Sequence, residues 1–268
     1  MRGGLAVAVL WTVQSLETFP PTGISAPVGL ARLVSFHWVL RSWKWLVRLA
    51  VVAVVAYLLG LFTPWALLCM SVCVICLVTA ASSDGSVTQG DHLVAIVVLV
   101  QFAAVVVWNA QSRWHVGLGR YVVGSQDATA AWWSIQAIVA VYFTSGLTKL
   151  LRTHGAWIDL SPGVLVSALS RLETAQAVVT TRYAKRRRVE QLVARLLPHP
   201  AITRLLFAGG LLCELLAPIG LLGENILLLI GVALIALHQM NRRLLLLPCV
   251  TYQVIVLTFL VNIPRFWR

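Results

Sequence analysis

Residues 46–63 (LVRLAVVAVVAYLLGLFT) and 65–81 (WALLCMSVCVICLVTAA) form two nearly unbroken apolar runs that only Pro64 separates. Each run is close to the ~20 residues that an α-helix needs to cross the hydrocarbon core of a bilayer. A transmembrane β-barrel would alternate apolar and polar residues, whereas these runs are continuous. The two runs therefore predict a helical hairpin in a membrane, with a tight turn at the proline.

The composition of the whole chain agrees with a membrane protein. Hydrophobic residues make up 59% of the 268 residues, charged residues make up only 11%, and the mean hydropathy is +0.87. Because a soluble domain carries roughly 25% charged residues, this chain has too little polar material to cover a water-soluble fold. The fold class that we expect is all-α, a polytopic integral membrane helical bundle formed as one domain over residues 1–268.

Five further apolar segments have the length of a membrane span. They are 92–108, 132–151, 201–222, 226–241 and 244–263. Together with the hairpin they predict seven spans, and the stretch 5–19 adds an eighth as a short span or a re-entrant helix. The segment 29–46 mixes basic and aromatic residues, which is typical of an interfacial helix.

The net charge of +12 comes from 21 basic and 9 acidic residues. Basic residues collect in the cytoplasmic loops of membrane proteins, which indicates the side on which the basic segments lie. We place four segments on the cytoplasmic side of the membrane, namely residues 29–46, 82–91 and 152–200 and the Arg242–Arg243 turn. The cluster Arg182–Arg188 is expected to contact anionic lipid, and we expect no nucleic-acid partner. The heavy use of Arg, Ala and Val indicates a GC-rich bacterial genome, and hence a bacterial cell membrane.

Ionisable groups at membrane depth are costly, which makes them functional candidates. Lys149 lies near the end of its span, and Tyr142, Gly146 and Lys149 share one helix face at the spacing i, i+4, i+7. Gly146 would let another helix or a ligand approach closely. The alternative for Lys149 is that its ammonium extends to the membrane interface.

Glu214 lies in the middle of an apolar run and needs a partner. Lys149, Arg204 and His238 are the candidates for that partner. Pro218 follows four residues later and interrupts the backbone hydrogen bonds of the helix. A kinked helix beside a buried carboxylate suits a cavity, but a structural hydrogen bond between helices would use the same residue.

Two further pairs of polar residues lie at the ends of predicted spans. His238 and Asn241 share a helix face at the spacing i, i+3. An imidazole there can donate or accept a proton near neutral pH, although a histidine that caps the helix would occupy the same place. Asp91 and His92 open an earlier span, where Asp91 would be an N-cap or an acid of the first turn.

Several chemistries find no support in the sequence. There is no glycine-rich phosphate loop, no His/Cys cluster for tightly bound zinc and no Asp-rich string that would clamp Mg²⁺ on a diphosphate. Cys73 and Cys76 form a C-x-x-C within an apolar helix, but no charged neighbour would activate the thiols. We interpret these cysteines as small buried side chains, and we expect no metal site.

Three strings of the sequence, in order and at matching separations, resemble a known family. Residues 142–150 (YFTSGLTKL), followed by Trp157, are similar to the pattern Y-F-x-x-G-x-x-K-L…W. The strings that begin at Glu214 (ELLA) and at His238 (HQMN), followed by Pro248, are similar to the pattern acid-L-L-A…H-x-M-N…P. Both patterns belong to the vitamin K-dependent gamma-carboxylase-like membrane domain, often called HTTM.

The resemblance covers about residues 85–268 and implies that Lys149 acts as a base. A lysine in a low-dielectric site gives up its charge more readily, so a neutral amine becomes available. In the family, the matching lysine is thought to deprotonate a reduced quinone, whose oxygenation drives proton removal from glutamate. His238 would assist this proton transfer or hold an anionic intermediate. The chain stops at Arg268 without the large β-rich domain that docks the carboxylase's peptide, so carboxylation of protein glutamates is not expected.

Three functions are compatible with these residues. The first is a membrane enzyme that acts on a small lipophilic substrate by terpene-type cyclisation of an isoprenoid diphosphate, as some bacterial relatives of the domain are thought to do. Lys149, His238 and Glu214 would be its catalytic residues. Its substrate-binding residues would be Tyr142, Asn241, Asp91, His92, Arg152, Arg242 and Arg243.

The second function is quinone epoxidation coupled to carboxylation or oxidation, and the third is a non-enzymatic membrane accessory or immunity protein. The cofactor differs between the two enzymatic functions. Cyclisation would use Mg²⁺ together with the diphosphate, whereas the second function would use a reduced quinone. The sequence leaves this choice open.

Overall fold

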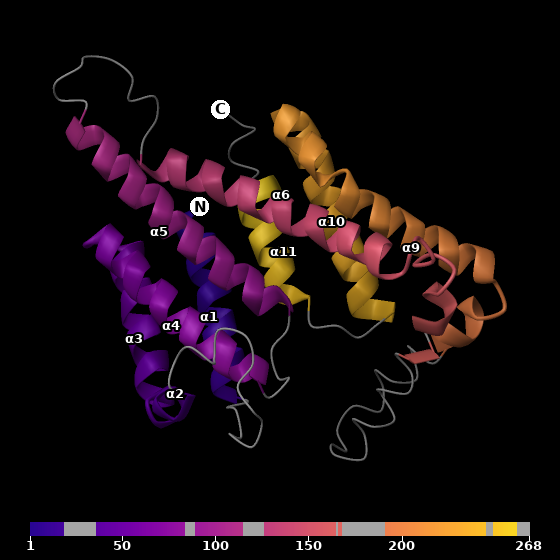
Figure 1. Ribbon diagram of the computed structural model, residues 1–268, viewed down its shortest axis with the longest axis horizontal. Helices are drawn as coiled ribbons and strands as arrows, with labels where there is room; N and C mark the ends of the chain where they lie inside the picture. The colour runs from indigo at the N-terminus through magenta and orange to yellow at the C-terminus, as the bar shows by residue number, and fades with distance from the viewer. Residues whose placement is uncertain are drawn as a thin grey trace. The chain divides into compact units, whose positions relative to one another are not determined.

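The computed structural model describes residues 1–18, 36–83, 89–114, 126–164, 166–167, 191–244 and 249–261. Within these ranges the regular elements are all helices and no strand occurs, as Figure 1 shows. The predicted all-α class is thereby confirmed. The chain divides into two compact units, which we call unit 1 (Met1–Ile138 with Val250–Arg268) and unit 2 (Val139–Cys249).

Four helices of the described part are long and apolar enough to cross a membrane. They are α4 (Thr63–Ser83), the stretch Gly90–Gln111 of α5 (Gln89–Trp114), α6 (Gln126–Arg152) and α10 (Glu224–Leu244). Each of them contains an apolar run from which the sequence predicts a span, and each extends that run at both ends. The remaining predicted spans stay predictions.

Unit 1 is built around helix α1 (Arg2–Thr18), which corresponds to the apolar stretch 5–19. Helix α1 packs against α3 (Trp43–Leu58), α4, α5 and α11 (Val250–Val256). Helix α3 buries one stripe of side chains at helical spacing, as expected for an amphipathic helix. The stripe comprises Leu46, Val47, Ala50, Ala53, Val54 and Tyr57.

The structure contains the helical hairpin that the sequence predicts, but its turn precedes Pro64, and α3 is shorter than the expected span 46–63. Helix α3 ends at Leu58 and α4 begins at Thr63, so the turn occupies only residues 59–62. Gly60 has a φ of +73°, a left-handed conformation that glycine adopts without strain. Pro64 lies in the first turn of α4, where a missing N–H leaves no hydrogen bond unmade. The two helices consequently lie side by side (Figure 1).

Two predicted segments of unit 1 differ from the observed helices. The segment 29–46 is divided at Ser42 between α2 (Phe36–Arg41) and α3, and its residues before Phe36 lie outside the described part. The span expected over 244–263 consists of α11 followed by the π-helix η4 (Leu257–Val261), and the two together are shorter than a membrane span.

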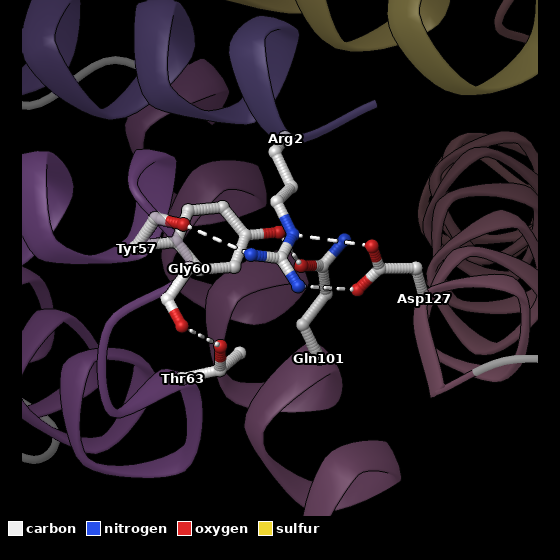
Figure 2. A network of polar contacts seen from close by, with 6 residues as sticks. All are labelled: Arg2, Tyr57, Gly60, Thr63, Gln101 and Asp127. Carbon is white, nitrogen blue, oxygen red and sulfur yellow. Dashed lines mark hydrogen bonds and ion pairs between the residues drawn. The ribbon is translucent and has the colours of Figure 1, made fainter.

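A polar network ties the start of α1 to three other helices of unit 1 (Figure 2). The Arg2 guanidinium donates to both carboxylate oxygens of Asp127, at 2.8 and 3.2 Å, and to the Tyr57 carbonyl oxygen at 3.3 Å. The Tyr57 hydroxyl donates to Oε1 of the buried Gln101 at 2.8 Å. Arg2 therefore lies at the C-terminal end of α3 while Asp127 lies in the first turn of α6, and both charges suit the helix dipoles.

Unit 2 contains the second half of α6, α9 (Pro200–Leu215), the 3₁₀-helix η3 (Ala217–Leu222) and α10, which packs against both α9 and η3 (Figure 1). The span predicted over 201–222 is therefore not one continuous α-helix. Pro218 has no N–H with which to continue the helix, and its ring would clash with the carbonyl of Glu214. The α-helix accordingly ends just after Glu214 and continues as a 3₁₀-helix.

Candidate functional site

One face of α6 contributes to two polar contacts of unit 2, Lys149 with Glu214 and Tyr142 with His238, which we call the polar centre. Tyr142, Gly146 and Lys149 lie on this face at the predicted spacing, and all three contact residues of α9 or α10. Tyr142 and Gly146 are buried, and Lys149 is half-buried. Because a helix rises 1.5 Å per residue, Tyr142 and Lys149 are separated by about 10 Å along its axis.

Lys149 forms an ion pair with Glu214 of α9. Its Nζ atom lies 2.5 Å from each of the two carboxylate oxygens. The Glu214 side chain is 8% exposed and that of Lys149 is 29% exposed. Of the three partners that the sequence allows for Glu214, the structure selects Lys149, while Arg204 pairs with the exposed Asp159 at 3.3 Å.

The Lys149 ammonium also lies over an aromatic face. Its Nζ atom is 5.6 Å from the centroid of the Trp157 ring, within the range of a cation–π interaction. Trp157 in turn packs against a small apolar cluster of unit 2 centred on Val193, Phe207 and Leu244. The ammonium is therefore held between a carboxylate and an indole.

Gly146 permits the close approach of α6 and α9 that this ion pair requires. A Cβ atom at Gly146 would lie 3.1 Å from Cβ of Glu214 and 3.1 Å from Cδ2 of Leu215. This is closer than ordinary van der Waals contact, so a longer side chain would push the helices apart. The sequence-based expectation that another helix approaches at Gly146 is confirmed.

Replacing Gly146 by leucine is expected to destabilise the protein by about 2 kcal/mol through overpacking. Thermal unfolding of the purified protein in detergent measures this loss. Gly209→Leu is the matched control, because Gly209 lies on α9 and a Cβ atom there would meet no other atom within 4 Å. Since leucine has the higher helix propensity, the control should be at least as stable as the wild type. Equal losses in both variants would contradict the close approach.

Tyr142 forms the second polar contact of this face, with His238 of α10. Its Oη atom lies 2.5 Å from His238 Nε2, and the two ring centroids are 5.6 Å apart. Both side chains are buried. The phenol and the imidazole form a hydrogen-bonded pair in which a proton can move between two groups.

The other predicted site residues of unit 2 lie further from these contacts. Asn241 is half-buried and follows His238 by one turn of α10. Arg152 lies in the last turn of α6, and Arg242 and Arg243 lie in the last turn of α10. All three arginines are exposed. Their positions leave them accessible to an anionic group at the helix ends.

Asp91 and His92 belong to unit 1. Asp91 is buried in the first turn of α5, which is one of the two positions that the sequence predicts for it. Thr12 Oγ1 donates a hydrogen bond to its Oδ1 atom at 3.1 Å. Nε2 of the exposed His92 lies 3.3 Å from Ser82 Oγ. These contacts connect α5 to α1 and to the end of α4, which gives both residues a part in packing unit 1.

The described residues contain no group of His, Cys, Asp or Glu side chains that could hold a metal ion. The five cysteines are free, and Cys73 and Cys76 are buried within α4, in agreement with their interpretation as packing residues. The basic cluster Arg182–Arg188 and Pro248 lie outside the described residues.

Two features of the polar centre were not predicted from the residues alone. The first is the pairing of Tyr142 with His238, which are 96 residues apart. The second is the contact of Lys149 with Trp157, for which the only sequence signal is the place of Trp157 in the HTTM-like pattern.

Among known proteins, no family model, no curated protein and no solved structure matches the chain.

Proposed function

We propose that the chain is an integral membrane protein with seven or eight spans in a bacterial cell membrane, and that it is an enzyme for a small lipophilic substrate. The four helices that are long and apolar enough to cross a membrane support the first part. Exposed apolar side chains on α10, such as Leu229 and Val232, suit contact with lipid chains. A lipophilic substrate would then reach the polar centre of unit 2 from the bilayer.

The contact of Tyr142 with His238 is the observation that carries the enzymatic part of the proposal. A buried phenol–imidazole pair can accept a proton from a substrate and return it, which is general acid–base chemistry. We assign proton transfer to this pair. Lys149, which Glu214 holds in an ion pair, places a positive charge in the polar centre.

The reaction that we propose is cyclisation of an isoprenoid diphosphate. The exposed Arg152, Arg242 and Arg243 would bind the diphosphate, together with any Mg²⁺ that accompanies it. The bond between carbon and the diphosphate oxygen breaks, and the diphosphate leaves with the electron pair. An aromatic face in the site would stabilise the resulting carbocation. The ring closes, and His238 takes the terminating proton, which leaves a cyclic alkene.

Incubating membranes that contain the wild-type protein with isoprenoid diphosphates of increasing chain length tests this proposal. Gas chromatography with mass spectrometry should detect a cyclic product that is absent from membranes containing His238→Gln. Arg195→Gln is the control, since Arg195 is exposed and has no part in the proposed site. A parallel incubation with a reduced naphthoquinone tests for the epoxide instead. The absence of any cyclic product from a folded wild-type protein would refute the cyclisation.

A non-enzymatic membrane protein is the second candidate, and one observation favours it. Lys149 and Glu214 satisfy each other's charge, as a structural pair between helices would. This candidate predicts that Tyr142 and His238 can be replaced without loss of function whenever the protein still inserts. Loss of function at normal membrane abundance would exclude it.

A further inference from the structure

The outward face of helix α3 in unit 1 changes character along its length. At its start, together with α2, lie five exposed residues that we call the basic–aromatic surface. They are Trp38, Arg41, Lys44, Trp45 and Arg48. Between residues 36 and 58 the sequence contains no Asp or Glu. The basic–aromatic surface therefore carries three positive charges that no acidic residue of its own helices neutralises.

Beyond the basic–aromatic surface the same face is entirely apolar. Leu49, Val52, Val55 and Leu59 follow one another at helical spacing, and all of them are exposed. Val52, in the middle of this stripe, is 64% exposed. The stripe ends at the turn into α4, where Phe62 is also exposed. A single helix face thus begins with cations and aromatic rings and continues with bare aliphatic side chains.

Trp45 and Arg48 are arranged as a unit at the boundary between the two parts. The Arg48 guanidinium carbon lies 5.3 Å from the centroid of the Trp45 ring, in a cation–π contact. The Trp45 side chain is nevertheless 69% exposed. Its indole is amphipathic and suits the level of lipid headgroups, where Trp is enriched in membrane proteins.

We propose that the basic–aromatic surface binds the headgroups of anionic phospholipids, while the apolar stripe below it contacts their acyl chains. A phospholipid presents a phosphate and then a hydrocarbon chain in this same order. Helix α3 has 16 residues and is about 24 Å long, which fits within the roughly 30 Å of a bilayer core. The proposal does not depend on the acid–base proposal.

Native mass spectrometry of the full chain in detergent, titrated with phosphatidylglycerol or phosphatidylcholine, tests the proposal. Each cation near an anionic surface contributes about fivefold in affinity, so Lys44→Gln with Arg48→Gln should weaken phosphatidylglycerol binding about 25-fold. Phosphatidylcholine binding should not change. The matched control is Arg195→Gln with Arg204→Gln, which also removes two exposed cations and should leave the preference for phosphatidylglycerol intact. An equal loss in this control would overturn the proposal.

Four further measurements keep the test decisive if the variant Lys44→Gln with Arg48→Gln misfolds. The swap Lys44→Arg with Arg48→Lys should keep the preference for phosphatidylglycerol, and added salt should reduce it in the wild type. Inorganic phosphate should not displace the lipid, because it has no acyl chains for the apolar stripe. Displacement by phosphate would overturn the proposal in favour of a free-anion site. Light scattering that finds a dimer in the wild type and a monomer in the swap variant would overturn it in favour of a second copy.

Discussion

Replacing Lys149 by methionine is expected to lower the free energy of unfolding by about 3 kcal/mol, because the variant leaves the Glu214 carboxylate buried without its cation. For a chain of this size the loss corresponds to a fall in Tm of about 6 to 12 °C. Thermal unfolding in detergent measures it. A Lys149→Met protein as stable as the wild type would show that the ion pair contributes nothing to the fold.

Replacing the other partner, Glu214, should lower the free energy of unfolding by less, because the two side chains are not equally buried. Glu214→Gln leaves an ammonium whose side chain is 29% exposed, and its flexible stem can carry the charge toward water. A loss of about 1 kcal/mol is therefore expected, as for a partly exposed pair. A larger loss in Glu214→Gln than in Lys149→Met would contradict the observed burial.

The double variant Lys149→Met with Glu214→Leu separates stability from function. Replacing both members of a buried ion pair by apolar residues of similar size is often nearly neutral, so the double variant should recover most of the stability that Lys149→Met loses. A stable but inactive double variant would assign the pair a functional role. A stable and active one would identify it as structural.

Apolar patterning predicts the helices of this chain well, and the exceptions have physical causes. The run 65–81 lies within α4 (Thr63–Ser83) and differs from it by two residues at each end. Helix α6 begins before the run 132–151, and its first residues are polar or small. The run does not show this start, because Asp127 in the first turn is stabilised by Arg2, which is 125 residues away. The run 201–222 is interrupted near Pro218, as its sequence predicts, and α9 ends at Leu215, before the 3₁₀-helix η3.

The candidate site could be predicted only in part. Helical spacing places Tyr142, Gly146 and Lys149 on one face, and the cost of burying a lone carboxylate requires a partner for Glu214. The identity of each partner depends on how helices distant in sequence pack together. Periodicity within one helix carries no information on that packing. The pairing of Tyr142 with His238 could therefore be found only from the structure.

His238→Gln is expected to reduce the rate of product formation by about 10²- to 10⁴-fold, the usual contribution of a general acid or base. Glutamine can place its amide near the position of Nε2 and keep the hydrogen bond to Tyr142, but it cannot exchange a proton at neutral pH. The fold should therefore survive while the chemistry fails. Product formation from isoprenoid diphosphates, together with Tm in detergent, measures the two effects separately.

Tyr142→Phe tests whether the phenol and the imidazole act as one unit. The variant keeps the ring in its buried position and removes only the hydroxyl that contacts His238. If the two groups share one proton path, combining Tyr142→Phe with His238→Gln should reduce the rate no further than His238→Gln alone, because residues that act as a unit are not additive. Multiplicative losses would mean that the two groups contribute independently. Full activity in His238→Gln would remove the imidazole from the mechanism altogether.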